Sequence, residues 1–109
     1  MKFADLRGFL DALSGQRDLV RVEEPVSPRF DMTAVADRVL RAGGPALLFS
    51  RPTGHAIPVV ANLFGTTRRV AAGMGADYPS ELRAIGELVA TLKEPDPPKG
   101  VRDAARLLA

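Results

Sequence analysis

One histidine, two adjacent glutamates and two adjacent arginines are the side chains whose chemistry stands out in this 109-residue sequence. His55 is the only histidine and cysteine is absent, so a zinc-type site would lack its usual ligands. As a general base, His55 would also need a nucleophile and an orienting acid. We therefore interpret His55 as a residue of an exposed turn without a catalytic task.

The two pairs of adjacent charged residues are better explained by structural roles than by catalysis or ligand binding. Glu23 and Glu24 are adjacent on a predicted strand, so their carboxylates face opposite sides and cannot converge on one substrate. Arg68 and Arg69 stand at the start of a predicted short helix and could reach a phosphate or a carboxylate. The favoured alternative is a salt bridge to a neighbouring element or domain. The sequence thus predicts no catalytic, cofactor-binding or metal-binding residue in this segment.

The glycines do not form a phosphate-binding loop, and the charges do not indicate a nucleic-acid binder. Gly73-Met74-Gly75 lacks the third glycine and the preceding strand of a dinucleotide fingerprint. Net charge is only +2, tryptophan is absent, and the basic residues are dispersed among acids. A nucleic-acid surface normally clusters its basic residues and adds aromatic stacking groups, so we expect no nucleic-acid partner.

The first third of the chain predicts a helix and then a strand. Apolar residues recur at helical spacing up to Gly15, which is a plausible stop; they are Phe3, Leu6, Phe9, Leu10 and Leu13. Residues 19–23 alternate like a half-buried strand, and Pro25 and Pro28 end it in a turn because neither can donate to a sheet.

A second helix follows the turn. Asp31 is predicted as its N-cap, and Asp37 lies on its polar face. An apolar stripe at i, i+3, i+4, i+7, i+8 runs through it; its members are Met32, Val35, Ala36, Val39 and Leu40. Gly43 and Gly44 favour a C-terminal cap, and Pro45 prevents continuation.

Two more strands complete the expected sheet. Residues 46–49 read as a buried strand, 52–54 as a turn and 57–61 as the returning strand. Strand, helix and strand form a β-α-β unit, and the last two strands form an antiparallel hairpin. We expect an α+β (α/β-like) fold: a small three-stranded mixed sheet packed by about four helices.

The remaining residues predict helices and a linker. Thr66 can cap a short helix, and Pro79 suits the first turn of a longer one. The longer helix carries an apolar stripe of Leu82, Ile85, Leu88, Val89 and Leu92. Residues 95–100 form a proline-rich linker, and 101–109 begin another amphipathic helix. We expect a domain over 1–94, with 101–109 leading into a further domain of a longer protein.

Beyond these patterns, the sequence resembles the N-terminal part of UbiD-like decarboxylases, the 4-hydroxy-3-polyprenylbenzoate decarboxylase family. The resemblance covers nearly the whole segment in order. It is carried by Asp5-Leu6-Arg7 with Phe9-Leu10, by 36–49 (ADRVLRAGGPALLF), by 57–66 (IPVxANLFGT), by Arg69-Val70-Ala71 with Met74-Gly75, and by 94–100 (EPxPPKG). Thr67 departs from the family pattern, in which proline is common.

The resemblance implies a decarboxylase that uses prenylated FMN, Mn²⁺ and K⁺, all held by a later domain. The catalytic Glu-Arg-Glu network and the Met-His-Trp segment of the family have no counterpart here, so no site residue is carried over. It implies removal of CO₂ from 4-hydroxy-3-polyprenylbenzoate in ubiquinone biosynthesis, with this segment alone inactive. A non-catalytic interaction or oligomerisation module is the alternative hypothesis.

Composition and resemblance together set expectations for partners and location. A hydrophobic fraction of 46% and a charged fraction of 26% are typical of a soluble globular protein. No apolar run approaches the roughly 20 residues that span a bilayer, and the first residues do not form a secretory signal. We expect a cytoplasmic protein that packs on its own cofactor domain and forms a homo-oligomer. A polyprenylated substrate would allow peripheral association at the inner membrane.

Overall fold

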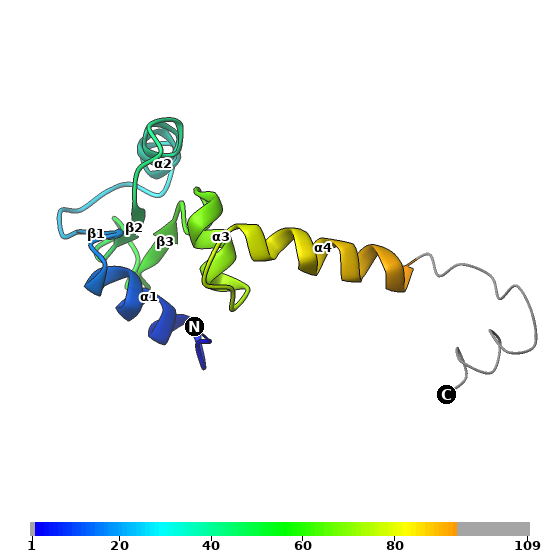
Figure 1. Ribbon diagram of the computed structural model, residues 1–109. Helices are drawn as coiled ribbons and strands as arrows, with labels where there is room; N and C mark the ends of the chain where they lie inside the picture. Colours follow the sequence, from blue (N-terminus) through cyan, green and yellow to red (C-terminus); the bar gives the residue numbers. More distant parts are fainter. Residues whose placement is uncertain (1, 94–109) are drawn as a thin grey trace, which may run out of the picture.

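The computed structural model describes residues 2–93 and contains a three-stranded sheet with helices around it (Figure 1). In chain order the elements are α1 (Leu6–Gly15), β1 (Leu19–Val22), α2 (Asp31–Arg41), β2 (Ala46–Phe49), β3 (Val59–Ala61), α3 (Thr67–Gly73) and α4 (Ser80–Lys93). This arrangement confirms the predicted α+β fold class. The predicted linker at 95–100 and the helix predicted over 101–109 lie outside the described residues.

The sheet has the order β1-β2-β3 and is mixed, as predicted. β1 and β2 are parallel, with Leu19 opposite Ala46, and α2 makes the crossover between them. β2 and β3 are antiparallel, with Phe49 opposite Val59. β3 starts at Val59, two residues later than predicted. Pro58, directly before it, has no N–H to donate to a ladder.

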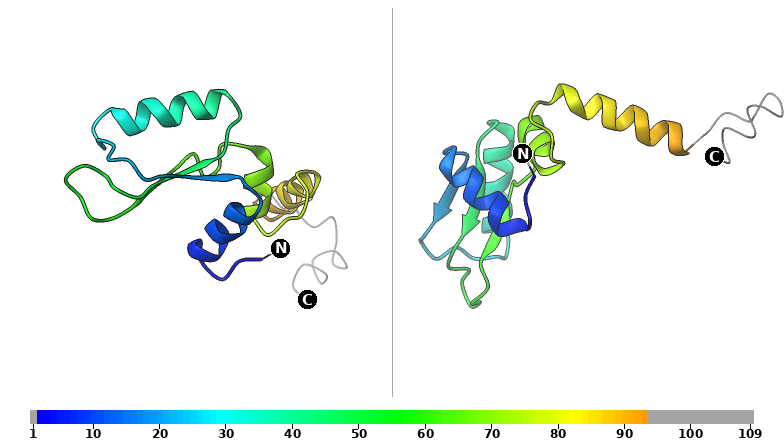
Figure 2. Two further views of the ribbon diagram at one scale, coloured as in Figure 1. Left: turned by 90° about the vertical axis from the view of Figure 1, so that its left-hand side faces the viewer. Right: turned by 60° about the horizontal axis from the view of Figure 1, so that its bottom comes forward.

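Helices cover both faces of the sheet. α1 lies on one face and α2 on the other, with the strands between them (Figure 2, left). Because strand side chains alternate, β1 and β2 each contribute to two apolar clusters, one on either face of the sheet. The cluster under α1 consists of Phe9, Leu13, Leu19 and Ala46, and the cluster under α2 consists of Met32, Leu47 and Phe49. The sheet is therefore the middle layer of a small three-layer sandwich.

The start of α2 differs from the prediction, because Phe30 and not Asp31 occupies the N-cap position. Phe30 has φ 72° and makes no side-chain cap bond, while Asp31 is the first helical residue. Ser27 organises the entry instead: its Oγ accepts from the Arg29 N–H, and its carbonyl accepts from the Met32 N–H. The Asp31 carboxylate still suits the positive end of the helix dipole.

α3 begins as predicted, with Thr66 as its N-cap. The Thr66 Oγ1 accepts from the backbone N–H of Arg69 at 3.2 Å. A cap of this kind satisfies one of the helix donors that has no intrahelical partner. The bond therefore gives the Arg69 N–H a partner in the first turn of α3.

Replacing Thr66 by alanine should lower the free energy of unfolding by about 1 kcal/mol, because the Arg69 N–H loses its acceptor. Thr67 is the matched control: it is exposed and is the first residue of the same helix. Thr67→Ala should change stability by less than about 0.5 kcal/mol. Urea denaturation of both variants checks this, and equal losses would show that the cap bond contributes nothing.

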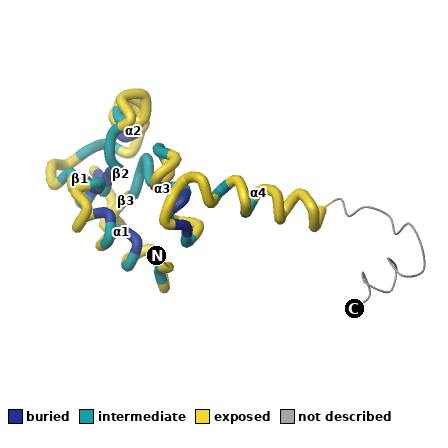
Figure 3. The backbone as a smooth tube through the Cα atoms, in the orientation of Figure 1, coloured by how far each residue is buried: buried dark blue, intermediate teal, exposed yellow. Residues whose placement is uncertain are grey.

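α4 extends away from the sheet, and none of its residues is buried (Figures 1 and 3). Its predicted apolar stripe is therefore present on a helix but is not packed in the core of this domain. Within residues 2–93, no helix combines the length and the apolar character needed to cross a membrane.

Candidate functional site

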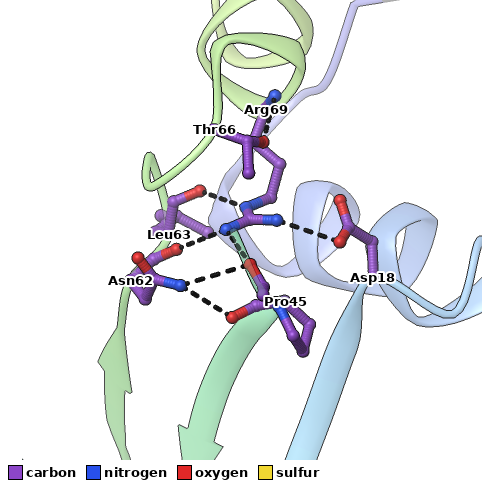
Figure 4. Close-up of polar contacts among 7 residues, drawn as sticks. Asp18, Pro45, Asn62, Leu63, Thr66 and Arg69 are labelled. Atoms are coloured by element: carbon purple, nitrogen blue, oxygen red, sulfur yellow. Dashed lines mark hydrogen bonds and ion pairs between the residues drawn. The ribbon is translucent and has the colours of Figure 1, made fainter. Parts of the chain in front are cut away.

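The buried charge of this domain is Arg69, at the start of α3. Its side chain is 1% exposed, and it is the one charged residue that is buried among residues 2–93. From the first turn of α3 the guanidinium points to the end of the sheet (Figure 4). Burying a guanidinium is costly unless its donors are paired, so its partners decide what it does.

All three guanidinium nitrogens of Arg69 donate to groups of this chain. Nη1 donates to Asp18 Oδ1 at 2.9 Å, and Nε donates to the carbonyl of Leu63 at 3.0 Å. Nη2 donates to the carbonyls of Gly44 at 2.9 Å and Asn62 at 3.0 Å. We call Asp18, Gly44, Asn62, Leu63 and Arg69 the Arg69 hub.

The hub joins the ends of all three strands. Asp18 directly precedes β1, Gly44 lies two residues before β2, and Asn62 directly follows β3. Since β3 runs antiparallel to the other strands, its end lies at the same edge of the sheet as their beginnings. Arg69 therefore fixes the position of α3 against this edge, with partners up to 51 residues apart in sequence.

Asn62 extends the hub with its side chain. Its backbone has φ 56°, a left-handed conformation that asparagine tolerates better than most residues. Its Nδ2 donates to the carbonyls of Pro45 at 2.9 Å and Gly44 at 3.3 Å. The Gly44 carbonyl thus accepts from both Asn62 and Arg69, and the turn into β2 is held from two directions (Figure 4).

This geometry decides between the two interpretations of the arginine pair. The donors of Arg69 are directed at Asp18 and backbone carbonyls, so the guanidinium does not present a fork to an external phosphate or carboxylate. The predicted salt bridge to a neighbouring element is confirmed for Arg69. Arg68 is exposed and lines a cleft beside α1 with Gln16 and Phe3.

The other residues considered from the sequence are not brought together. His55 is exposed in the β2–β3 loop, where its backbone N–H donates to the Pro52 carbonyl. Glu23 and Glu24 are exposed beyond the end of β1. In the described part of the chain, no group of three or more His, Cys, Asp or Glu residues could hold a metal ion. The prediction that this segment carries no catalytic or cofactor residue stays a prediction.

Sequence reasoning did not find Asp18 or Asn62. Asn62 had a local signal, because Asn62-Leu-Phe-Gly65 marks a sharp corner in which a left-handed residue is expected. Asp18 had none. It precedes an ordinary strand, and its partner lies in another element.

Comparison with known proteins fixes the family. A model of the 3-octaprenyl-4-hydroxybenzoate carboxy-lyase N-terminal domain, UbiD_N, matches residues 10–89. The chain belongs to the UbiD family. The matched residues include all five residues of the Arg69 hub and the elements that they join, β1, β2, β3 and α3. The hub is thus part of the UbiD N-terminal domain of this protein.

Solved UbiD-family structures have the same fold. The chain is similar to Sedimentibacter hydroxybenzoicus vanillic acid decarboxylase (ShVdcCD) in open form, with TM-score 0.65 and 33% identity over 71% of this chain. A second structure of that enzyme in open form, with truncated ShVdcD, gives the same TM-score of 0.65 and the same 33% identity over 71% of this chain. The chain covers 17% of the matched chain in each case.

Proposed function

We propose that this chain is the N-terminal scaffold of a longer UbiD-family enzyme that removes CO₂ from an aromatic acid. The observation that carries the scaffold role is the Arg69 hub, in which the buried cation holds strand ends together. The match to the UbiD N-terminal domain supports the reaction class. The match covers 17% of the vanillic acid decarboxylase chain. In this proposal the reacting groups belong to polypeptide beyond these residues.

The proposed substrate is a 4-hydroxybenzoate derivative. The description of the matching family favours 4-hydroxy-3-polyprenylbenzoate, hence a step in ubiquinone biosynthesis. The similar structure is a vanillic acid decarboxylase. Vanillic acid and the polyprenylated acid share a hydroxyl group opposite the carboxylate and differ in the substituent beside that hydroxyl. The residues that select this substituent lie outside the N-terminal domain in this proposal.

The proposed cofactor of the whole enzyme is prenylated FMN with Mn²⁺ and K⁺. The residues described here do not fit these groups, because within 2–93 no carboxylate and histidine cluster could hold the metal. Arg69, the buried cation, already donates to its own chain. In this proposal the cofactor domain that follows supplies every ligand.

The proposed partners follow from the scaffold role. The domain packs against its own cofactor domain within a homo-oligomer and takes no nucleic-acid partner. The whole enzyme works in the cytoplasm and meets a polyprenylated substrate by peripheral contact with the inner membrane.

The 109-residue chain should release no CO₂ from either acid when supplied with prenylated FMN, Mn²⁺ and K⁺. The full reading frame that contains it, treated in the same way, should decarboxylate at least one of them. The measurement is CO₂ release with 4-hydroxy-3-polyprenylbenzoate and with vanillate. Turnover by the 109-residue chain would contradict the scaffold role, and no turnover by the full protein would contradict the proposed reaction.

An interaction module is the second candidate, and one observation favours it. The apolar stripe of α4 is exposed on a helix that buries none of its residues in this domain. A surface of this kind normally meets another polypeptide segment.

A further inference from the structure

The segment 2–5, which precedes α1 (dark blue in Figure 1), places an aromatic ring in the groove between α1 and α3. Phe3 is partly buried and packs against the apolar cluster under α1. Its ring centroid lies 5.0 Å from that of Phe9, and the two ring planes are tilted by 48°. Tilted ring pairs at this separation are favourable beyond the area that they bury. The groove is thus occupied by an aromatic ring of the chain itself.

Two clefts flank this ring, and Phe3 lines both of them. One cleft, of about 160 Å³, has Leu13 of α1 and Ala72 of α3 among its walls. The other, of about 220 Å³, is lined on its apolar side by Phe9 and Leu63. An apolar cavity of about 150 Å³ is large enough to take a benzene ring. Removing the Phe3 ring would therefore join two spaces that each have the size of a single ring.

The walls of the groove are held in place without Phe3. Phe9 and Leu13 are 5% and 2% exposed and belong to the core cluster under α1. Phe9 also stacks on Phe64, with ring centroids 6.1 Å apart. Gly73 allows Phe64 to approach α3, because a Cβ there would lie 2.6 Å from the Phe64 ring. The site for the ring is therefore formed by the folded domain and not by the segment that fills it.

The segment that carries Phe3 is attached to the domain chiefly by that ring. Within the described range 2–93, the backbone of residues 2–4 makes no hydrogen bond. Asp5 caps α1, since its Oδ1 accepts from the Gly8 N–H at 2.8 Å. This cap remains when residues 2–4 move away. Partial burial of one phenylalanine favours the closed segment by only about 10- to 30-fold, so the open form is a small but populated fraction of the molecules.

We propose that the groove between α1 and α3 is a binding site for a small aromatic molecule, and that the segment 2–5 is a strap whose Phe3 closes this site. The bound molecule displaces Phe3 and takes the place of its ring against Phe9, Leu13 and Ala72. Since only the open form binds, the apparent affinity of the unmodified chain is lowered by the fraction of molecules that is open. The proposal does not depend on the activity of the longer enzyme.

Phe3→Ala should bind phenol about 10- to 30-fold more tightly than the unmodified chain, because the competing ring is gone. Phenol is the probe because it is water-soluble and carries one phenyl ring. Phe30→Ala is the matched control: Phe30 is 75% exposed, lines neither cleft and should leave phenol binding unchanged. Amide chemical shifts, expected to move at Phe9, Leu13 and Ala72, measure the affinities. Equal affinities of Phe3→Ala and the unmodified chain would overturn the proposal.

Three further measurements test displacement and the class of ligand. Phe3→Leu keeps part of the apolar contact and should gain less affinity than Phe3→Ala, whereas an equal gain would contradict displacement. In the unmodified chain, saturating phenol should abolish the NOEs between the Phe3 and Phe9 rings, and their persistence would show that phenol binds elsewhere. Cyclohexanol should bind Phe3→Ala about three-fold more weakly than phenol, because it cannot make the ring pair with Phe9. Equal binding of the two alcohols would contradict an aromatic site.

Discussion

Arg69→Met should lower the free energy of unfolding of this domain by about 3–5 kcal/mol, the largest effect expected of any single substitution here. Methionine keeps the aliphatic volume but removes every donor. The carbonyls of Gly44, Asn62 and Leu63 then lose the Arg69 donor, and Asp18 loses its ion-pair partner. Breaking a buried charged pair typically costs this much; here Asp18 is 24% exposed, and the three carbonyls that lose a donor account for part of the loss. A domain of this size has only about 5–15 kcal/mol of stability in total.

Arg68→Met is the matched control, because Arg68 is the exposed neighbour on the same helix. It should change stability by less than about 0.5 kcal/mol. Arg69→Lys should recover less than half of the loss, since an ammonium cannot reproduce the planar fork that meets Asp18 and three carbonyls. Urea denaturation of the three variants measures these differences. A loss of less than about 1 kcal/mol in Arg69→Met would mean that the hub does not hold the strand ends.

Local patterns predicted the elements that neighbouring residues alone can specify. Gly43, Gly44 and Pro45 stop one helix and start a strand, and the strand over 46–49 has the bounds predicted for it. The entry to α2 was predicted wrongly at the N-cap. There the Ser27 turn, and not the side chain of Asp31, directs the chain into the helix. Turn geometry of this kind depends on several residues at once, so one good capping residue type does not determine the cap.

The hub could be predicted only in part, for a physical reason. The sequence indicated a salt bridge for the arginine pair, but the choice between Arg68 and Arg69 depends on which faces the sheet when α3 packs. Asp18 and Arg69 meet across 51 residues. No periodicity or motif in the sequence predicts such a pair, because the contact depends on how β1, β2 and β3 are arranged in the folded domain. Likewise, the stripe of α4 predicts an amphipathic helix but not which segment covers it.

The hub also explains why the scaffold can be stable although its apolar clusters are small. The two clusters together hold seven buried residues on opposite faces of a short sheet. Such a sheet leaves the ends of its strands without neighbours, and their carbonyls need partners when they are shielded from water. Arg69 and Asn62 supply donors to these carbonyls at one edge. The hydrogen bonds of Arg69 and Asn62 therefore stabilise the strand ends, which the two apolar clusters do not cover.

Gly65→Ala should lower the free energy of unfolding by about 2–4 kcal/mol, because a methyl group there collides with the hub. A Cβ on Gly65 would lie 2.6 Å from Asn62 Cγ and 3.0 Å from its Nδ2. The Asn62 amide must then leave its place and give up its bonds to the Gly44 and Pro45 carbonyls. Overpacking and lost buried hydrogen bonds each contribute about 1–3 kcal/mol.

Asn62→Gly separates the two causes, because it removes the side chain and still accepts the φ of 56°. Alone it should cost about 1–3 kcal/mol through the lost bonds. In this background Gly65→Ala should cost less than about 0.5 kcal/mol, since the colliding amide is gone. Gly15→Ala, whose Cβ would meet nothing within 4 Å, is the steric control and should not destabilise. Additive losses in the double variant would show that Gly65 is required for a reason other than the Asn62 side chain.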